Sequence, residues 1–545
     1  MLRFAALAAL VVPLAAHAQH AGHGTAGPPA GTATPSTALI LGRIDVRTSA
    51  TGAAAREIET GMLALHSFWY EEARDHFTAA QRLDAGAALA YWGEAATHDH
   101  PLWSQHDSTA GRAVFARLDS VRAAGTLRAT ARETATVDAL RALFAPGTAL
   151  SVRRDRYAEA TARLAAADPT DDEAAVFAAL AEMSRDVFDL NTAASVVPVA
   201  AGLEDVVLRN PEHPGAVHYL IHAYDSPAFA RLGLRPARAY AALAPASSHA
   251  LHMPSHIFSE LGMWAEKEAS NRVAWEASVA WQERTGRPVS ARDYHALAWL
   301  LDALLAQGRF ADARAVLAVA EADAALAAQR GEAPDYPAAT ALSLPAAYLR
   351  TARVAGLPGV AFPVPDGLDV AATEPRALYG LALRAALSGQ DEVLAAIVAA
   401  GAVATRDAPP SVASTAAADV AFLNALRLHA HGDARAFEAA REAIRLDVEA
   451  NPTDAPTSPA HVLLADLLLA RGDAAGSLAM YRAMAAAYPN RANTALGIAR
   501  ASAATGDTAA ARVAYAALLP TWTRADAGLP AADEARAYLA AQLAP

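Results

Sequence analysis

Residues 61–80 read GMLALHSFWYEEARDHFTAA, and this stretch decides the fold class. Gly61, Tyr70, Ala73, Phe77 and Ala80 stand where a repeat of two antiparallel helices places a glycine, an aromatic, an alanine, a second aromatic and a second alanine. Small residues let two helices approach closely, and the aromatic rings fill the space beside them. The stretch therefore predicts a helical hairpin that packs through its small residues.

The carboxyl-terminal part of the chain contains an internal repeat. Gly472-Asp473 recurs 34 residues later as Gly506-Asp507, and Tyr481 recurs at the same distance as Tyr515. This distance is the period of the tetratricopeptide (TPR) repeat, a pair of antiparallel helices that stacks on the next pair. We expect Gly472 and Gly506 to pack between helices, as Gly61 does. The sequence thus predicts an all-α chain, a TPR-like α-solenoid of helical hairpins.

Composition excludes several classes of protein. The chain has 545 residues, and its hydrophobic fraction of 54% consists largely of alanine with only 6% aromatics, which excludes a disordered chain and disfavours an all-β one. The net charge is −12 and Lys267 is the single lysine, so we expect no nucleic-acid partner. Because cysteine is absent, disulfides, thiolate metal ligands and a cysteine nucleophile are excluded.

The amino terminus has the pattern of a secretory signal. Arg3 precedes an apolar stretch, and Ala16-His17-Ala18 is the small-x-small pattern that a signal peptidase accepts. We therefore expect a cleaved signal peptide over residues 1–18, and a periplasmic or secreted mature protein without a lipoprotein cysteine. No later apolar run approaches the roughly 18 residues of a spanning helix, so no integral membrane protein is expected after cleavage.

The rest of the chain divides by composition. Residues 19–37 are rich in Gly, Pro, Ala and Thr and predict a disordered leader. Residues 38–355 predict an amino-terminal helical array, and residues 370–545 predict a carboxyl-terminal TPR array. Between them, residues 356–369 contain prolines and glycines that cannot continue a helix, and we place the main boundary there. A single superhelix with a loop bulging from it is the alternative.

Several motifs resemble one family. They are LHSFWYEEA (65–73), AYWGEA (90–95), HPLW (100–103), HPGAVHYLIHAYD (213–225), HALHMPSHIF (249–258) and PNRA (489–492). In this combination the chain resembles a family of exported bacterial TPR-repeat proteins, over nearly the whole mature length. The resemblance implies the fold and export, and it implies no reaction.

Clustered histidines are the most informative feature for function. His218 and His222 are four residues apart and Asp225 follows after three, so that on a helix the three side chains share one face. His249, His252 and His256 follow the same logic at intervals of three and four residues, with Pro254 inside the pattern either starting or kinking the helix. Imidazole nitrogens bind first-row divalent ions, and a carboxylate can ligate the ion or orient an imidazole. The pattern predicts one divalent transition metal, Zn, Cu or Fe.

Other histidines carry a weaker signal. Glu94, His98 and His100, followed by His106, are secondary candidates for the same centre. A buried histidine is usually hydrogen-bonded within the core, and we interpret six others in this way: His66, His76, His295, His429, His431 and His461. A structural hydrogen-bond network is also the alternative to a metal for the main cluster.

Standard enzyme signatures are missing. Tyr219 stands where the helix of a zinc metalloprotease needs a glutamate base, and no nucleophile elbow, P-loop or dinucleotide-binding turn follows a plausible strand. The leading hypothesis is an exported TPR scaffold that binds a protein, peptide or small ligand in its concave groove and holds a His/Asp metal centre. One alternative is a metal-dependent enzyme with Glu94 or His98 transferring protons, and another is a plain assembly scaffold.

Overall fold

The structure is a computed structural model that describes residues 39–103, 105–333, 335–404, 410–450 and 458–542. The predicted signal peptide (1–18) and leader (19–37) lie outside these residues. Contacts divide the chain into two compact units. The first unit comprises the described residues up to Leu261 together with Val273–Ala280, and the second comprises Gly262–Arg272 and the described residues from Trp281 onward.

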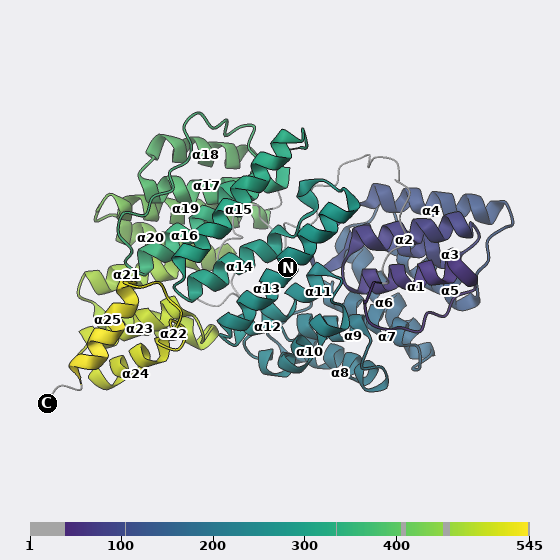
Figure 1. Cartoon of the computed structure of the whole chain (residues 1–545), viewed down its shortest axis with the longest axis horizontal. Coiled ribbons are helices and arrows are strands. Elements are labelled where there is room, and N and C mark those ends of the chain that lie inside the picture. The colour runs from purple at the N-terminus through teal and green to yellow at the C-terminus, as the bar shows by residue number, and fades with distance from the viewer. Residues whose placement is uncertain (1–38, 104, 334, 405–409, 451–457, 543–545) are drawn as a thin grey trace. The chain divides into compact units, whose positions relative to one another are not determined.

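The first unit is built from helices that follow one another closely along the chain (Figure 1). Its α-helices are α1 (Gly52–His66), α2 (Tyr70–Leu83), α3 (Ala88–Ala96), α4 (Ser108–Ala123), α5 (Ala131–Leu143), α6 (Leu150–Ala167), α7 (Asp172–Met183), α8 (Ala193–Arg209), α9 (Pro214–Ala223), α10 (Ala230–Leu243), α11 (Ser248–His252) and α12 (Pro254–Glu260). Two short strands, β1 (Asp99–His100) and β2 (Gln105–His106), pair antiparallel with Asp99 opposite His106, and the 3-10 helix η1 (Pro101–Trp103) follows β1.

The second unit has the same construction, and α13 (Trp264–Thr285) contributes residues to both units. Its other elements are η2 (Val289–Ala291), α14 (Tyr294–Ala306), α15 (Phe310–Gln329), α16 (Asp335–Val354), α17 (Pro375–Ser388), α18 (Asp391–Ala404), α19 (Pro410–Ala430), α20 (Ala436–Ala450), α21 (Pro459–Ala470), α22 (Ala474–Ala487), α23 (Ala492–Ala504), α24 (Thr508–Leu518) and α25 (Pro530–Ala541).

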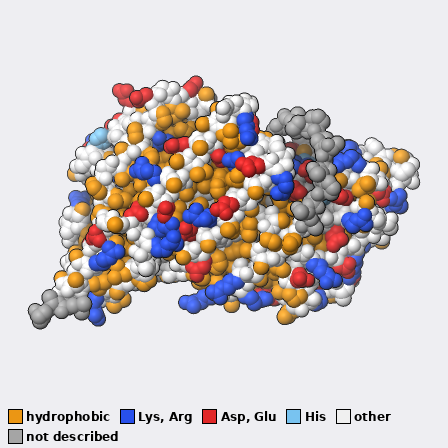
Figure 2. All heavy atoms as spheres, in the orientation of Figure 1, with side chains coloured by type: hydrophobic (Ala, Val, Ile, Leu, Met, Phe, Trp, Pro, Cys, Tyr) orange, Lys and Arg blue, Asp and Glu red, His pale blue; other side chains and the backbone are white. Residues whose placement is uncertain are grey.

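Each helix packs mainly on the next one in sequence, and several also pack on the next but one, as in α1 with α3, α7 with α9, and α21 with α23. Such nearest-neighbour packing is the mark of stacked helical hairpins. Among the described residues, no helix combines the length and the apolar character needed to cross a membrane. On the face shown in Figure 2, basic and acidic side chains are intermixed.

The packing register predicted for the first hairpin is confirmed. Phe77 is fully buried between α1 and α3, where Gly61 and Gly93 make room for its ring. A Cβ atom on Gly61 would lie 3.1 Å from the ring, and one on Gly93 would lie 2.1 Å from it. Ala73 and Ala80 are fully buried beside Phe77 on α2. In the last repeats, Gly497 gives Tyr481 the same room, with a Cβ-to-ring distance of 2.3 Å.

The expectation for Gly472 and Gly506 is wrong. Both have left-handed backbone, with φ of +86° and +80°, and no atom would lie within 4 Å of an added Cβ. They end α21 and α23 at the turns instead of packing between helices, since only glycine adopts this conformation without strain. The 34-residue period was therefore correct, but it marks turns and not helix crossings.

Gly93→Ala is expected to lower the free energy of unfolding by about 1–3 kcal/mol, because the new methyl group overpacks against the buried Phe77 ring. Gly202→Ala in the middle of α8 is the matched control, since Gly202 is exposed and its Cβ would meet nothing within 4 Å. The control should be neutral or stabilise by up to about 1 kcal/mol. Urea denaturation followed by circular dichroism checks both, and equal effects would contradict the packing register.

The segment 356–369 carries no helix, as its prolines and glycines predict, and it lies between α16 and α17 inside the second unit. A domain boundary at this segment stays a prediction, and the division between the two compact units falls elsewhere, near Gly262. The array expected from residue 38 opens with an extended stretch, since residues 39–51 form no helix and α1 begins at Gly52.

Candidate metal centre

Three short helices of the first unit position the central histidines. α9 begins at Pro214, which has the φ of a first helical residue, and the His213 side chain caps it by accepting a hydrogen bond from the Ala216 N–H. α11 ends at His252, and Pro254 begins α12, so that the proline starts a new helix. α12 packs on α9, and both α11 and α12 pack on α10. Histidines from two separate sequence motifs are thereby brought together.

His218, His222 and His249 converge through the same ring atom. Nε2 of His218 lies 3.0 Å from Nε2 of His222 and 3.1 Å from Nε2 of His249. Nδ1 of His218 lies 2.7 Å from the carbonyl oxygen of His66, to which it donates its proton. Two ligands of a tetrahedral zinc ion with Zn–N bonds of about 2.0–2.1 Å lie about 3.3–3.4 Å apart. The two distances from His218 are thus within a few tenths of an ångström of that value, and ligand atoms of all three histidines lie within 4.8 Å of one another.

A second pair stands beside these three. Nε2 of His252 lies 3.0 Å from Nε2 of His256, and Nδ1 of His256 donates to Oδ2 of Asp225 at 2.7 Å. A carboxylate on the far nitrogen fixes the tautomer and direction of a metal-binding imidazole. Asp225 lies beyond the end of α9 and orients His256, which is one of the two roles that its spacing allowed.

The five imidazoles form one continuous cluster. The ring centroids of His222 and His256 are 6.1 Å apart, and those of His249 and His252 are 6.0 Å apart. His218, His249 and His252 are buried, whereas His222 and His256 are half-buried, so the cluster is approached from their side.

Burial favours the neutral form of His218 and His222. It lowers the pKa of His218 well below its ordinary value, and it lowers the pKa of His222 to about 3, with repulsion from His256 adding to the effect. Neutral imidazole is the form that binds a metal ion. The lowered pKa values and the converging nitrogen atoms are therefore both compatible with a bound metal ion.

The structure does not bring Glu94, His98 and His100 into this cluster. The carboxylate of Glu94 accepts hydrogen bonds from Gln81, at 2.7 Å, and from Arg117. His100 lies between Oε1 of Gln105 and the carbonyl of Thr97, and its ring stacks on Tyr70 with centroids 3.8 Å apart. The pKa of His98 falls to about 4, chiefly through burial and then through nearby Arg74. His106 is held between Asp99 and Arg153.

Each unit is a TPR-like α-solenoid. No protein-family model and no curated protein sequence matches the chain. Among solved structures, the human IFIT1 dimer with m7Gppp-AAAA aligns with a TM-score of 0.38 at 13% identity, over 86% of this chain and 90% of that one. The IFIT1 dimer with PPP-AAAA gives a TM-score of 0.38 at 11% identity over the same shares. Naa15/Naa10 bound to HypK-THB aligns with a TM-score of 0.24 at 14% identity, over 88% of this chain and 65% of that one. Likeness at this level concerns the helical fold and carries no ligand with it.

Phe68, in the turn between the two helices of the first TPR-like hairpin, was not recognised from the sequence. Its ring centroid lies 4.5 Å from that of His218 and 5.5 Å from that of His249. Among the described residues it is the one non-glycine with positive φ, at +50°. Such backbone costs about 1–3 kcal/mol and occurs mainly at functional sites. The sequence signal for Phe68 was its position: it is a large residue in a turn whose positive φ favours glycine.

Further aromatic rings enclose the buried histidines. Tyr240 stacks on His218 with centroids 5.0 Å apart, and Trp103 meets His249 edge to face at 5.4 Å. The inner side of the cluster is therefore apolar, which excludes water and strengthens binding of an ion to the nitrogens.

Another buried group, His66, Glu173 and His213, is a hydrogen-bond network. Because Nδ1 of His213 accepts the Ala216 N–H, its proton must be on Nε2, which lies 3.1 Å from Oε1 of Glu173. Nε2 of His66 lies 2.8 Å from Oε2 of the same carboxylate, and its Nδ1 lies 3.2 Å from the hydroxyl of Tyr219. Each carboxylate oxygen thus faces one imidazole nitrogen, and the three residues also offer ligand atoms within 4.8 Å of one another.

Burial lowers the pKa of His66, although the carboxylate of Glu173 acts in the opposite direction. Burial acts to raise the pKa of Glu173, but the two histidines outweigh it and hold that pKa far below its ordinary value. His66 lies in a core network of the kind expected from the sequence. Its backbone carbonyl is also the group that orients His218.

Proposed function

We propose that the chain is a helical-repeat binding protein whose first unit holds one divalent transition-metal ion through His218, His222 and His249. His252 and His256 stand beside this position as further ligands, with Asp225 orienting His256. The observation that carries the proposal is the convergence of three Nε2 atoms while Nδ1 of His218 donates to a carbonyl.

A network of hydrogen bonds among the imidazoles explains this geometry less well than a bound metal ion does. Since neutral His218 keeps its proton on Nδ1, its Nε2 offers a single lone pair in the ring plane. Both His222 and His249 would have to donate to that one lone pair, at 3.0 and 3.1 Å. A metal ion instead accepts one lone pair from each of the three nitrogens.

The donor set defines the class of ion. Imidazole nitrogens suit Zn, Cu and Fe, whereas Mg and Ca need oxygen ligands. Three protein nitrogens leave at least one coordination position for a small ligand or a neighbouring imidazole. Binding is favoured over catalysis for two reasons. The carboxylate of Glu94, considered for proton transfer, is engaged by Arg117 and Gln81, and the pKa of His98, the other candidate, is lowered to about 4 by burial and by Arg74.

We extend the proposal to location. Residues 1–18 and the family resemblance support an exported protein that starts near Gln19 and works in the periplasm or outside the cell. Binding of a protein or peptide partner by the helical repeats belongs to the same proposal. Amino-terminal sequencing of protein from its native host checks the processing site.

The test of the metal centre is elemental analysis of tag-free protein after incubation with ZnCl₂, CuCl₂ or Fe²⁺ and gel filtration. About one ion per chain is expected for at least one of the three metals, and the double variant His222→Ala/His249→Ala should retain none. Wild-type protein without stoichiometric metal in all three incubations would overturn the metal centre and leave a plain helical scaffold.

A further inference from the structure

Residues 39–51, called the strap below, form no helix and lie on the first unit before α1. The strap joins α1 at Gly52, which has a φ of +61° and no atom within 4 Å of an added Cβ. Because this junction is open and permissive, the position of the strap is set by what it touches and not by α1.

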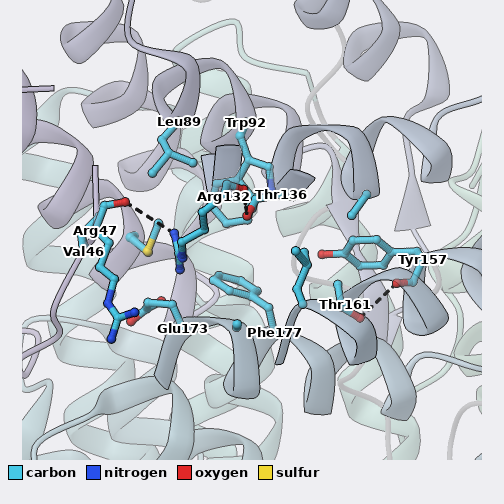
Figure 3. A pocket seen from close by; sticks show the side chains of 14 residues that line it. Val46, Arg47, Leu89, Trp92, Arg132, Thr136, Tyr157, Thr161, Glu173 and Phe177 are labelled. Atoms are coloured by element: carbon cyan, nitrogen blue, oxygen red, sulfur yellow. Dashed lines mark hydrogen bonds between the residues drawn. The ribbon is translucent and has the colours of Figure 1, made fainter. Parts of the chain in front are cut away.

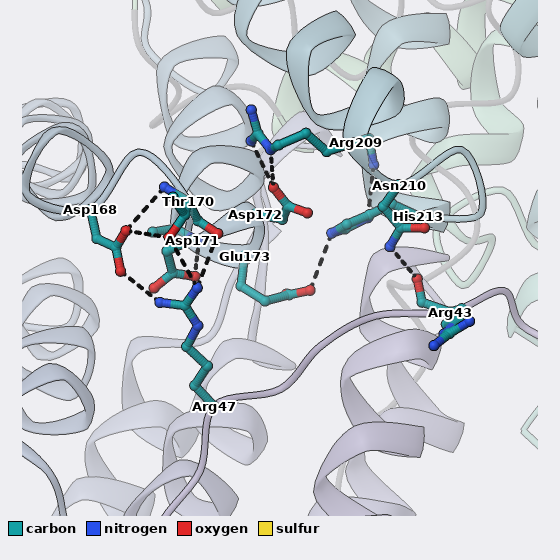
Figure 4. A network of polar contacts seen from close by, with 12 residues as sticks. Arg43, Arg47, Asp168, Thr170, Asp171, Asp172, Glu173, Arg209, Asn210 and His213 are labelled. Atoms are coloured by element: carbon teal, nitrogen blue, oxygen red, sulfur yellow. Dashed lines mark hydrogen bonds and ion pairs between the residues drawn. The ribbon is translucent and has the colours of Figure 1, made fainter.

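The strap contacts the starts of four helices in turn. The carbonyl of Ile40 accepts the N–H of Ala246, just before α11, at 3.4 Å. The N–H of Arg43 donates to the carbonyl of Glu212, just before α9, at 2.9 Å, and its own carbonyl accepts from Asn210 at 2.9 Å (Figure 4).

Two more contacts continue the series. The Arg47 guanidinium donates to Asp168 at 2.6 Å and to the carbonyl of Thr170 at 3.0 Å, and both acceptors lie just before α7 (Figure 4). The N–H of Ser49 donates to Oε1 of Glu133, in the first turn of α5, at 2.8 Å.

These contacts fall in register with the repeats. The helices α5, α7, α9 and α11 alternate along the chain, and the strap meets them in reverse order. Nine steps from residue 40 to residue 49 span about 30 Å in extended chain. Of these helices, α7 and α9 pack on each other, and packed helices lie about 8–10 Å apart. An extended peptide therefore meets one helix start about every three residues.

Side chains fix the register of the strap. Leu41 and Ile44 are buried, with 1% and 6% of their surface exposed, and Arg47 follows after three more residues. Gly42 has a φ of +92°, and a Cβ there would lie 2.7 Å from the carbonyl oxygen of Glu212. The surface thus selects a sequence: an apolar residue, glycine, a second apolar residue at +3 and arginine at +6.

The charges support the same selection. The hydroxyl and N–H of Thr170, and then Arg47, lower the pKa of Asp168 to about 2, so its carboxylate is charged opposite Arg47.

Val46 and Arg47 also close a cavity of about 30 Å³ whose wall includes Arg132, Glu173 and Phe177 (Figure 3). The cavity has room for one or two water molecules. The strap is therefore the outer wall above Glu173.

We propose that the starts of α5, α7, α9 and α11 form a peptide-binding surface, that residues 39–50 are its built-in ligand, and that the same segment of a second copy of this chain occupies it when the resident strap is released. A second copy carries the selected sequence by definition, and the open junction at Gly52 lets a strap leave its own chain. The surface then links two copies by exchange of straps.

The first experiment weakens the resident strap in the full chain. Leu41→Asp places a charge at the most buried strap position, so the variant should bind a fluorescent synthetic peptide of residues 39–50. Anisotropy should show binding at least 10-fold tighter to this variant than to wild type, whose own strap competes. A peptide with Gly42→Val is the control and should bind at least 10-fold more weakly. Equal binding of the two peptides, or none to a variant with wild-type circular dichroism, overturns the proposal.

The second experiment tests the second copy. A Leu41→Asp chain has an intact surface, and an Asp168→Ala/Glu133→Ala chain has an intact strap with a damaged surface. A mixture of the two is expected to form a heterodimer in gel filtration with light scattering, while each variant alone stays monomeric. A mixture that remains monomeric while the peptide binds would overturn the second copy as occupant.

A third experiment tests the proposal even if the Leu41→Asp variant fails to fold. A protease site inserted between Thr51 and Gly52, which are both exposed, lets the folded wild-type chain be cut beside the strap. The cut strap should stay with the chain in gel filtration and be displaced by excess synthetic peptide. Immediate loss of the cut strap, without rebinding of the peptide, overturns the proposal.

Discussion

Chelation is expected to lower the melting temperature of the metal-loaded wild-type chain by about 5–11 °C. An ion present at 100 times its dissociation constant stabilises the native state by about 2.7 kcal/mol. In a unit of about 150–250 residues, 1 kcal/mol corresponds to about 2–4 °C. Differential scanning calorimetry of protein loaded with ZnCl₂, with and without EDTA, measures the shift.

The variant His222→Ala should abolish this shift. His222 is half-buried, so its truncation leaves little cavity, yet it removes one of the three converging nitrogens. His429→Ala, in the second unit, is the control and should keep the full response to EDTA. The metal centre would be contradicted if the wild-type melting temperature changed with neither ZnCl₂ nor EDTA, or if His222→Ala kept the wild-type response to EDTA.

Glu173→Ala is expected to lower the free energy of unfolding by about 2–6 kcal/mol. Its carboxylate faces the N–H groups of His66 and His213, which are both fully buried. Each buried donor left without an acceptor costs about 1–3 kcal/mol. Urea denaturation followed by circular dichroism measures the loss.

Glu182→Ala is the matched control on the same helix. Its carboxylate is exposed and pairs with Arg185 at 3.0 Å, and an exposed pair contributes less than about 1 kcal/mol. If Glu173→Ala were no more destabilising than Glu182→Ala, the buried network would not be the stabilising element described above.

Much of the candidate centre could be predicted from spacing along helices. His218 and His222 share a face of α9 because four residues make about one helical turn, whereas His252 and His256 meet across the junction of α11 and α12. Spacing could not assign roles, since His249 joins His218 and His222 while Asp225, beyond the end of α9, supports His256. Glu94, His98 and His100 show the limit of the method, because their partners come from neighbouring segments.

Local periodicity was enough to predict the all-α fold and the hairpin register, because Gly61 and Phe77 meet at a spacing that any stacked helical pair must satisfy. Three other features depend on contacts between distant parts of the chain. Phe68 lies against the histidines with strained backbone, the His66 carbonyl sets the tautomer of His218, and the strap lies across four helix starts. Each of these features joins residues that are far apart in the chain. A contact of this kind leaves no local pattern in the sequence from which it could be predicted.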